Sequence, residues 1–141
     1  MSMKKLTIEF LLDQNAKARN IIAVSRNDTA KAASQVLTSN NIGVVLVLEN
    51  DRLVGVLSER DIVHRWVCGP KFPADVKVED IMTKEVECVT TDDTVYDCYL
   101  RFAARKCRHL PILDPLQNVI GVLSMRDVSA YVVDRLSETP S

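Results

Sequence analysis

The chain has 141 residues and a mass of 15.8 kDa, the size of one ordinary domain or two small ones. Apolar residues make up 47% and charged residues 26% of it, which excludes a disordered or collagen-like protein. The net charge of −1 gives no positive field for nucleic acid. Because no apolar run approaches the roughly 18 residues of a membrane span and no signal sequence is apparent, we expect a cytoplasmic protein with neither nucleic acid nor membrane as its partner.

The first predicted element is a helix at about residues 4–15, with Leu6, Phe10 and Leu11 on its apolar side. After it the sequence predicts a short strand, a helix capped at Asp28-Thr29, an apolar hairpin, and a second helix. These elements are expected at residues 21–25, 29–40, 44–48 and 53–57, with the second helix from residue 59.

The second half of the chain repeats the first. Residues 55–62 read GVLSERDI and residues 121–128 read GVLSMRDV, which are identical at six of eight positions. The second copy is predicted to have strands at 86–90, 110–113 and 119–123, and helices at 94–106 and from residue 125. Each β-α-β-β-α copy makes a poor core alone, so we expect an α/β fold in which the copies pack with pseudo-two-fold symmetry. The predicted parts are an N-terminal helix (1–13), a first domain (14–68), a linker (69–80) and a second domain (81–137).

The repeated octad ends a strand and opens a helix, so its Ser and Asp meet at the first helical turn. These residues are Ser58 and Asp61 in the first copy, and Ser124 and Asp127 in the second. One interpretation is a capping box, in which both side chains serve backbone N–H groups. The alternative is that an exposed carboxylate here accepts hydrogen bonds from both hydroxyls of a ribose, while the helix N-terminus attracts phosphate. Capping does not require the Arg that each octad also carries (Arg60 and Arg126), and this favours the nucleotide interpretation.

The whole repeat resembles a tandem pair of cystathionine-β-synthase-type (CBS) domains, known as a Bateman module. The resemblance is carried by the two octads, Asp-Thr before each first helix, HLPILD at 109–114 and DIMT at 80–83, and it covers about residues 14–137. We therefore expect no attached catalytic domain. The resemblance implies a non-enzymatic regulatory module with two clefts between the copies that bind adenosine-containing ligands.

The resemblance also assigns roles by position. Asp61 and Asp127 would hold ribose, with Ser58 and Ser124 beside ribose or phosphate. The side chains expected to line the base or contact the ligand are Ile22, Val45, Met82, Val89 and Leu110.

Basic residues just before the second strand of a copy commonly face the phosphates in such pairs. Arg108 and His109 occupy this position in the second copy, whereas the first copy has Gly43 and Val44. This departure argues against equivalent occupancy of the two clefts.

Four cysteines, at 68, 88, 98 and 107, lack the paired spacing of a zinc site or a redox dithiol. We therefore expect buried free thiols and no metal. Apolar residues on the second helix of each copy predict a two-fold homodimer. These residues are Ile62, Val63, Trp66, Val128, Tyr131 and Val132.

The sequence thus predicts a cytoplasmic, non-enzymatic sensor of adenine nucleotides that requires no cofactor. AMP is the first expected ligand, then ATP, ADP or NAD(H), and S-adenosylmethionine after these. Two alternatives remain open: a ligand-free dimerisation or interaction module in which the octads are only caps, and an enzyme acting on nucleotides. The regulated target protein is not predicted.

Overall fold

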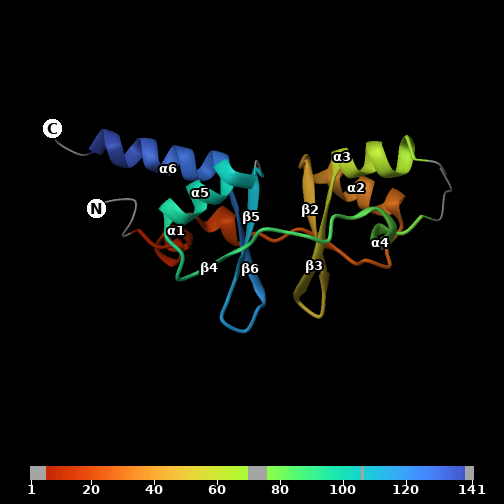
Figure 1. The fold of residues 1–141 in the computed structure, drawn as a ribbon, viewed down its shortest axis with the longest axis horizontal. Helices are drawn as coiled ribbons and strands as arrows, with labels where there is room; N and C mark the ends of the chain where they lie inside the picture. The colour runs from red at the N-terminus through yellow and green to blue at the C-terminus, as the bar shows by residue number, and fades with distance from the viewer. Residues whose placement is uncertain (1–5, 70–75, 106, 139–141) are drawn as a thin grey trace. The chain divides into compact units, whose positions relative to one another are not determined.

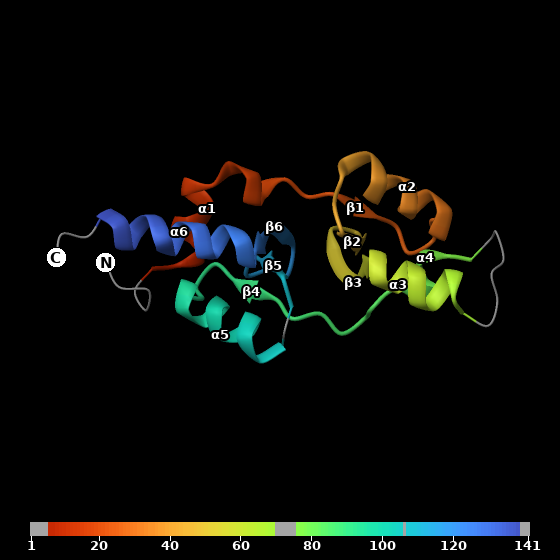
Figure 2. The same ribbon diagram turned by 90° about the horizontal axis from the view of Figure 1, so that it is seen from above.

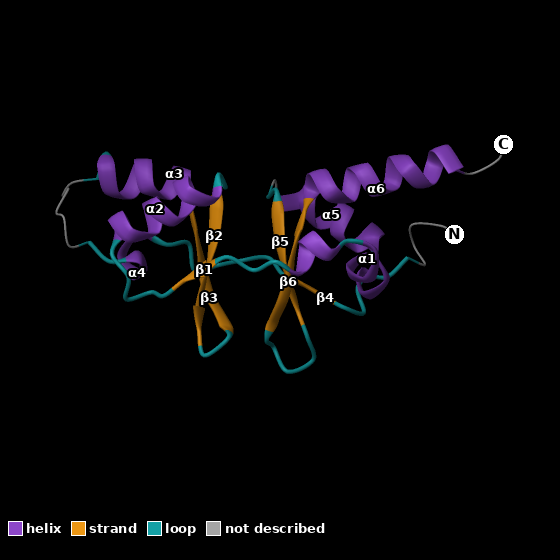
Figure 3. Cartoon of the chain, turned by 180° about the vertical axis from the view of Figure 1, so that it is seen from behind, coloured by secondary structure: helices purple, strands orange, loops and turns teal. Residues whose placement is uncertain are grey.

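The structure, a computed structural model, describes residues 6–69, 76–105 and 107–138. The chain forms two compact units (Figure 1). One unit spans Ile22–Val86, and the other combines the N-terminal residues up to Ile21 with the residues from Glu87 onward. Each unit contains one three-stranded sheet, and its helices lie on one side of that sheet (Figure 3).

The first-copy unit has the strand order β1-β2-β3, with β1 parallel to β2 and β2 antiparallel to β3. Its strands are β1 (Ala23–Val24), β2 (Val44–Glu49) and β3 (Arg52–Ser58). Its helices are α2 (Ala30–Asn40), α3 (Glu59–Asp61), which continues into a π-helical segment η2 (Ile62–Val67), and the short α4 (Val78–Ile81).

The second-copy unit has the equivalent order β4-β5-β6, with the same pattern of one parallel and one antiparallel pair. Its strands are β4 (Val89–Thr90), β5 (His109–Leu113) and β6 (Val119–Ser124). Its helices are α5 (Val95–Arg105), α6 (Met125–Glu138), the N-terminal α1 (Ile8–Gln14) and the 3₁₀ turn η1 (Ala16–Arg19). The predicted α/β class, with two β-α-β-β-α copies and an N-terminal helix, is confirmed.

The Asp-Thr pairs begin the first helix of each copy, as the sequence predicts. Thr29 Oγ1 accepts a hydrogen bond from Ala32 N at 3.0 Å, and Thr94 Oγ1 accepts one from Asp97 N at 3.1 Å. These bonds satisfy N–H groups that have no partner within the helix. The same local chemistry therefore starts α2 and α5.

Each unit is completed by the segment that precedes the other copy in the chain. Helix α1, before the first copy, lies with the second-copy elements, and α4, before the second copy, lies with the first (Figure 2). Thr7 bridges to Thr94, and Lys77 bridges to Thr29. This exchange adds apolar side chains to both cores, and the sequence analysis did not predict it. The buried residues supplied in this way are Leu6, Ile8, Leu11 and Leu12 in one unit, and Val78, Ile81 and Met82 in the other.

Two expectations about burial are wrong. Trp66 (9% exposed) and Val128 (4% exposed) belong to the cores of their own units, so they leave no apolar surface for a partner. Cys98 is buried, but Cys68 is exposed because it follows the last turn of η2. Buried thiols at all four cysteines are therefore not observed.

Candidate functional site

The strand pairing places the two octads in equivalent positions. Ser58, the last residue of β3, is opposite Val44 on β2, and Ser124, the last residue of β6, is opposite His109 on β5. Residues that pair directly across two strands project from the same face of the sheet. The structure therefore places the imidazole of His109 on the same face as Ser124, where the first copy has only a valine.

The Arg that precedes His109 contributes its backbone to the same junction. The carbonyl of Arg108 accepts a hydrogen bond from Met125 N at 2.8 Å, and the carbonyl of Gly43 accepts the equivalent bond from Glu59 N at 2.9 Å. Arg108 and His109 therefore occupy the same structural positions in the second copy as Gly43 and Val44 in the first, as the sequence alignment indicates. The side chain of Arg108 is exposed.

The first octad forms a complete capping box. Ser58 Oγ accepts a hydrogen bond from Asp61 N at 3.0 Å, and Asp61 Oδ2 accepts one from Ser58 N at 3.1 Å. Both side chains therefore satisfy backbone donors at the start of α3, which is the capping interpretation of the motif.

The carboxylate of Asp61 also binds two further side chains of its own unit. The hydroxyl of Thr83 donates to it, with distances of 3.1 and 3.2 Å to its two oxygens, and Arg65 Nε lies 3.8 Å from Oδ1. Asp61 is only 8% exposed. The prediction of an exposed carboxylate is therefore wrong for the first copy.

The second octad forms only half of the same arrangement. Ser124 Oγ accepts a hydrogen bond from Asp127 N at 3.0 Å. Within the described part of the chain, no hydrogen bond or ion pair engages the carboxylate of Asp127, and its side chain is half-buried. The second octad thus presents a carboxylate and a hydroxyl at the N-terminus of the long helix α6, with an imidazole near them.

The electrostatics of His109 depend on this neighbourhood. His109 is exposed at the start of β5, and partial burial of its imidazole lowers the pKa below its usual value, while the Asp127 carboxylate raises this pKa and the Arg108 guanidinium lowers it. The imidazole is therefore predominantly neutral at neutral pH. A bound phosphate beside it would favour the protonated form.

The remaining predicted site residues fall into two groups. Arg60 and Arg126 are exposed on the first turns of α3 and α6. The side chains expected at the base contribute to the two hydrophobic cores, and their contact with a ligand stays a prediction. Of these, Val45, Val89 and Leu110 are at most 1% exposed, Met82 is 7% exposed, and Ile22 is partly buried.

Sequence reasoning missed the partners of Asp61. Thr83 is the last residue of the quoted DIMT segment, but nothing in its local pattern indicated a bond to an octad 22 residues away. Arg65 lies one turn after Asp61, and that spacing is the available signal for the pair.

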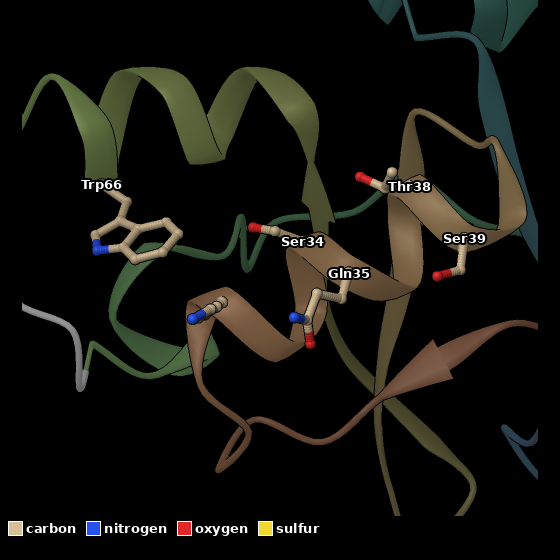
Figure 4. Close-up of a pocket in the computed structure, with 6 residues that line it drawn as sticks. Ser34, Gln35, Thr38, Ser39 and Trp66 are labelled. Carbon is tan, nitrogen blue, oxygen red and sulfur yellow. The ribbon is translucent and has the colours of Figure 1, made fainter.

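A small groove lies elsewhere in the first-copy unit. Its volume is about 240 Å³, and Lys31, four polar residues of α2 and Trp66 line it (Figure 4). It contains no octad residue, so it is separate from the candidate site. Residues 6–69, 76–105 and 107–138 contain no cluster of three His, Cys, Asp or Glu side chains suited to a metal ion, and no helix among them is long and apolar enough to cross a membrane.

Comparison with known proteins identifies the family. The sequence model of the CBS domain matches residues 17–67 and 78–134, so the chain belongs to the CBS domain family with two copies in tandem. A protein of Methanopyrus kandleri without an assigned function is 33% identical over 124 residues, which are 85% of this chain. The matched region spans 63% of the length of that relative.

Solved structures of CBS-domain proteins have the same fold. The CBS-domain protein NE2398 is 33% identical, and the superposition covers 90% of this chain and 97% of that one with a TM-score of 0.79. PAE2072 from Pyrobaculum aerophilum, solved with AMP, is 22% identical, with a TM-score of 0.71 over 84% of this chain and 93% of that one. The CBS pair of MJ0100, solved with 5′-methylthioadenosine and S-adenosylmethionine, is 22% identical, with a TM-score of 0.71 over 81% and 92% of the two chains.

Proposed function

We propose that the protein is a non-enzymatic regulatory module that binds an adenosine-containing nucleotide at the second octad, with AMP as the first candidate and ATP, ADP or NAD(H) next. One observation carries the proposal: Asp127 keeps its carboxylate available beside Ser124 and near His109. The AMP complex of the P. aerophilum protein and the adenosine-based ligands of MJ0100 support this ligand class.

Each part of AMP has a chemical counterpart at this site. The two ribose hydroxyls would donate to the Asp127 carboxylate, a charge-assisted contact. Met125 N and Asp127 N already donate to Arg108 and Ser124, so the phosphate would accept hydrogen bonds from the remaining first-turn N–H of α6, that of Arg126, and from the protonated imidazole of His109. The exposed guanidinium of Arg108 could reach the phosphate as a forked donor. Together these groups recognise a nucleotide more strongly than a nucleoside.

Calorimetry with AMP and adenosine tests the proposal. Asp127→Asn should weaken both ligands by about 1.5–3 kcal/mol, the usual size of hydrogen bonds to a charged group, because both ligands carry the ribose. Arg108→Ala should weaken AMP by a similar amount and leave adenosine unchanged, because only AMP carries the phosphate. Arg52→Ala, an exposed arginine of the first-copy unit, is the matched control and should change neither affinity.

Three outcomes separate the interpretations of Arg108. Loss of AMP affinity alone supports the phosphate contact. Unchanged AMP affinity means that Arg108 is only a solvated residue, and equal losses for AMP and adenosine mean that the variant is misfolded.

The two alternatives have their own tests. A ligand-free interaction module would show no thermal shift with AMP, ATP or NADH, whereas a ligand at 100 times its Kd adds about 2.7 kcal/mol of stability. The complete capping box at Ser58 and Asp61 favours this alternative for the first octad only. An enzyme acting on nucleotides would convert ATP or NADH during incubation, and we expect both to be recovered unchanged.

We also propose that the protein works as a homodimer in the cytoplasm, requires no cofactor, and regulates a target protein according to its bound nucleotide. Support for the dimer comes from large apolar side chains on helices that remain exposed within their own units. They are Val63, Val67, Tyr99, Leu100 and Val133.

A further inference from the structure

We infer that each chain binds one nucleotide, at Asp127, because Asp61 is a structural clamp that holds the segment Ile81–Thr83 against its own unit. This inference rests on the proposed function and specifies its site. It assigns different roles to two octads whose Ser, Arg and Asp residues are the same.

The clamp begins with the donors around Asp61. Ser58 N, the Thr83 hydroxyl and Arg65 Nε all approach its carboxylate, at 3.1, 3.1 and 3.8 Å for the closest oxygen. A ribose would have to displace the hydroxyl of Thr83 and compete with a guanidinium. Since Asp61 is 8% exposed, few directions of approach remain.

Arg65 extends the clamp to the backbone. Its Nη1 donates to the carbonyls of Ile81 and Met82, at 3.3 and 2.9 Å. Thr83 and Val56 exchange two backbone hydrogen bonds, of 2.8 and 2.9 Å, which attach the segment to β3. Asp61 therefore completes a network that joins α3, η2, β3 and the segment after α4.

The second unit shares the close backbone approach at the octad glycine, without the clamping side chains. A Cβ atom added at Gly55 would lie 2.8 Å from the carbonyl oxygen of Thr83, and one added at Gly121 would lie 2.5 Å from that of Ala18. Ala18 thus occupies in the second unit the place that Thr83 has in the first. An alanine side chain offers no hydroxyl, so Asp127 lacks the donor that occupies Asp61.

The position of Arg65 also differs between the copies. When residues 55–62 are aligned with 121–128, Arg65 corresponds to Tyr131, which carries no positive charge. The basic side chains that could pair with a phosphate lie in the second-copy unit, where Arg108 and His109 replace Gly43 and Val44 of the first copy. The absence of an arginine at position 131 and the presence of Arg108 and His109 therefore both favour nucleotide binding at the second octad.

Calorimetry with AMP measures both the number of sites and their location. We expect one AMP per wild-type chain, a loss of affinity of about 10- to 150-fold for Asp127→Asn, and a change of less than about 2-fold for Asp61→Asn. Two AMP molecules per chain, or a loss of AMP affinity in Asp61→Asn of the same size, would overturn the inference.

Thr83→Val provides a second variant in case Asp61→Asn does not fold. It removes the hydroxyl, nearly conserves the side-chain volume, and keeps the backbone bonds to Val56. We expect unchanged AMP affinity and stoichiometry together with a lower midpoint of urea unfolding. An additional AMP site in this variant would show that Asp61 is a ribose-binding residue held closed by Thr83, and would also overturn the inference.

The clamp can be tested separately from ligand binding. In a double-mutant cycle of Asp61→Asn and Thr83→Val, unfolding midpoints that are less than additive establish the clamp, and additive midpoints refute it. If wild-type protein binds none of AMP, ATP, NADH or S-adenosylmethionine, the proposed function is wrong, and this cycle still decides the role of Asp61.

Discussion

Gly121 is the position where the segment before the first copy comes closest to the second octad. A Cβ atom added there would lie 2.5 Å from the carbonyl oxygen of Ala18 and 3.2 Å from Leu12 Cδ2. Carbon and carbonyl oxygen atoms ordinarily approach to about 3.3 Å. Gly121→Ala therefore requires a backbone displacement of roughly 0.8 Å, because the atom it meets is not part of a flexible side chain.

The expected magnitude follows from the cost of overpacking, which is about 1–3 kcal/mol. Gly121→Ala should lie at the upper end, about 3 kcal/mol, because both the carbonyl of Ala18 and the buried side chain of Leu12 must move. Gly55→Ala should cost less, about 1–2 kcal/mol, because its contact with the Thr83 carbonyl is longer, at 2.8 Å, and its other neighbour is the flexible side chain of Met82.

Gly43 provides the matched control. An added Cβ there meets only Glu59 Cδ, at 4.0 Å, and none of the described glycines has a positive φ. Gly43→Ala should therefore leave stability unchanged or raise it by about 0.4–1 kcal/mol, by restricting the unfolded chain. That restriction is common to all three variants, so their differences report the native contacts.

Urea unfolding followed by circular dichroism measures these differences. The expected order of midpoints is Gly43→Ala highest, then Gly55→Ala, with Gly121→Ala lowest. Equal midpoints for Gly121→Ala and Gly43→Ala would mean that the segment containing Ala18 does not lie against β6, and would refute the exchange of segments between the copies.

Three further predictions concern the ionisable side chains of His109 and Cys98. Burial lowers the pKa of His109, and a phosphate would raise it, so protonation of His109 should favour AMP binding as the pH falls from 8 towards 6. Because the phosphate of AMP also titrates at about pH 6, the measurement is the ratio of the AMP affinities of wild type and His109→Gln. This ratio should rise over that range, and a constant ratio would contradict the role of His109. The same lowered pKa means that His109 makes the protein less stable as the pH falls through about 6.5, because the unfolded chain then binds the proton more readily. Burial also raises the pKa of Cys98 to about 12. Ellman's reagent should therefore modify the exposed Cys68 first and Cys98 only on unfolding. Early modification of Cys98 would show that this thiol is not buried.

Features governed by local chemistry were predictable from the sequence. The Asp-Thr pairs at 28–29 and 93–94 start helices because their side chains serve N–H groups within three residues. The apolar hairpins follow from strand pattern and turn residues that are adjacent in the chain. The internal repeat then required each such element to occur twice.

The exchange of segments was not predictable from these patterns. Thr7 pairs with Thr94 across most of the chain, and no periodicity in either segment specifies that partner. The apolar side of α1 indicated that another part of the chain covers it. Hydrophobic contact is non-directional, so the pattern does not specify which copy supplies the covering side chains. Leu6 and Leu11 are buried as predicted, in the core of the other copy.

The difference between Asp61 and Asp127 has the same origin. Both octads satisfy the same local pattern, and the residues that distinguish them, Thr83 and Ala18, lie outside the octads and reach them only through the exchange. Motif matching therefore assigns one role to both carboxylates. The departure at Arg108 and His109, and the alignment of Arg65 with Tyr131, are the differences between the two sites that the sequence itself contains.

The proposed dimer can be tested through two valines of the helical segment after the first octad. Val63 and Val67 are 48% and 49% exposed and lie one turn apart. Burying the exposed half of a valine contributes about 1 kcal/mol, so the four valines of a two-fold dimer would contribute roughly 4 kcal/mol, or about 10³ in Kd. Replacing both with Glu removes this contribution and places like charges together.

Light scattering at micromolar concentration measures the outcome. Wild-type protein should have twice the chain mass of 15.8 kDa, and the Val63→Glu/Val67→Glu variant should have the mass of one chain. Leu116→Glu is the matched control, because Leu116 is 71% exposed in the turn between β5 and β6, away from any helix face. It should remain dimeric. A wild-type monomer would refute the dimer. A double variant that stays dimeric would place the interface on other helices. The reason is that a two-fold interface formed by this face would bury four new carboxylates without compensating charge.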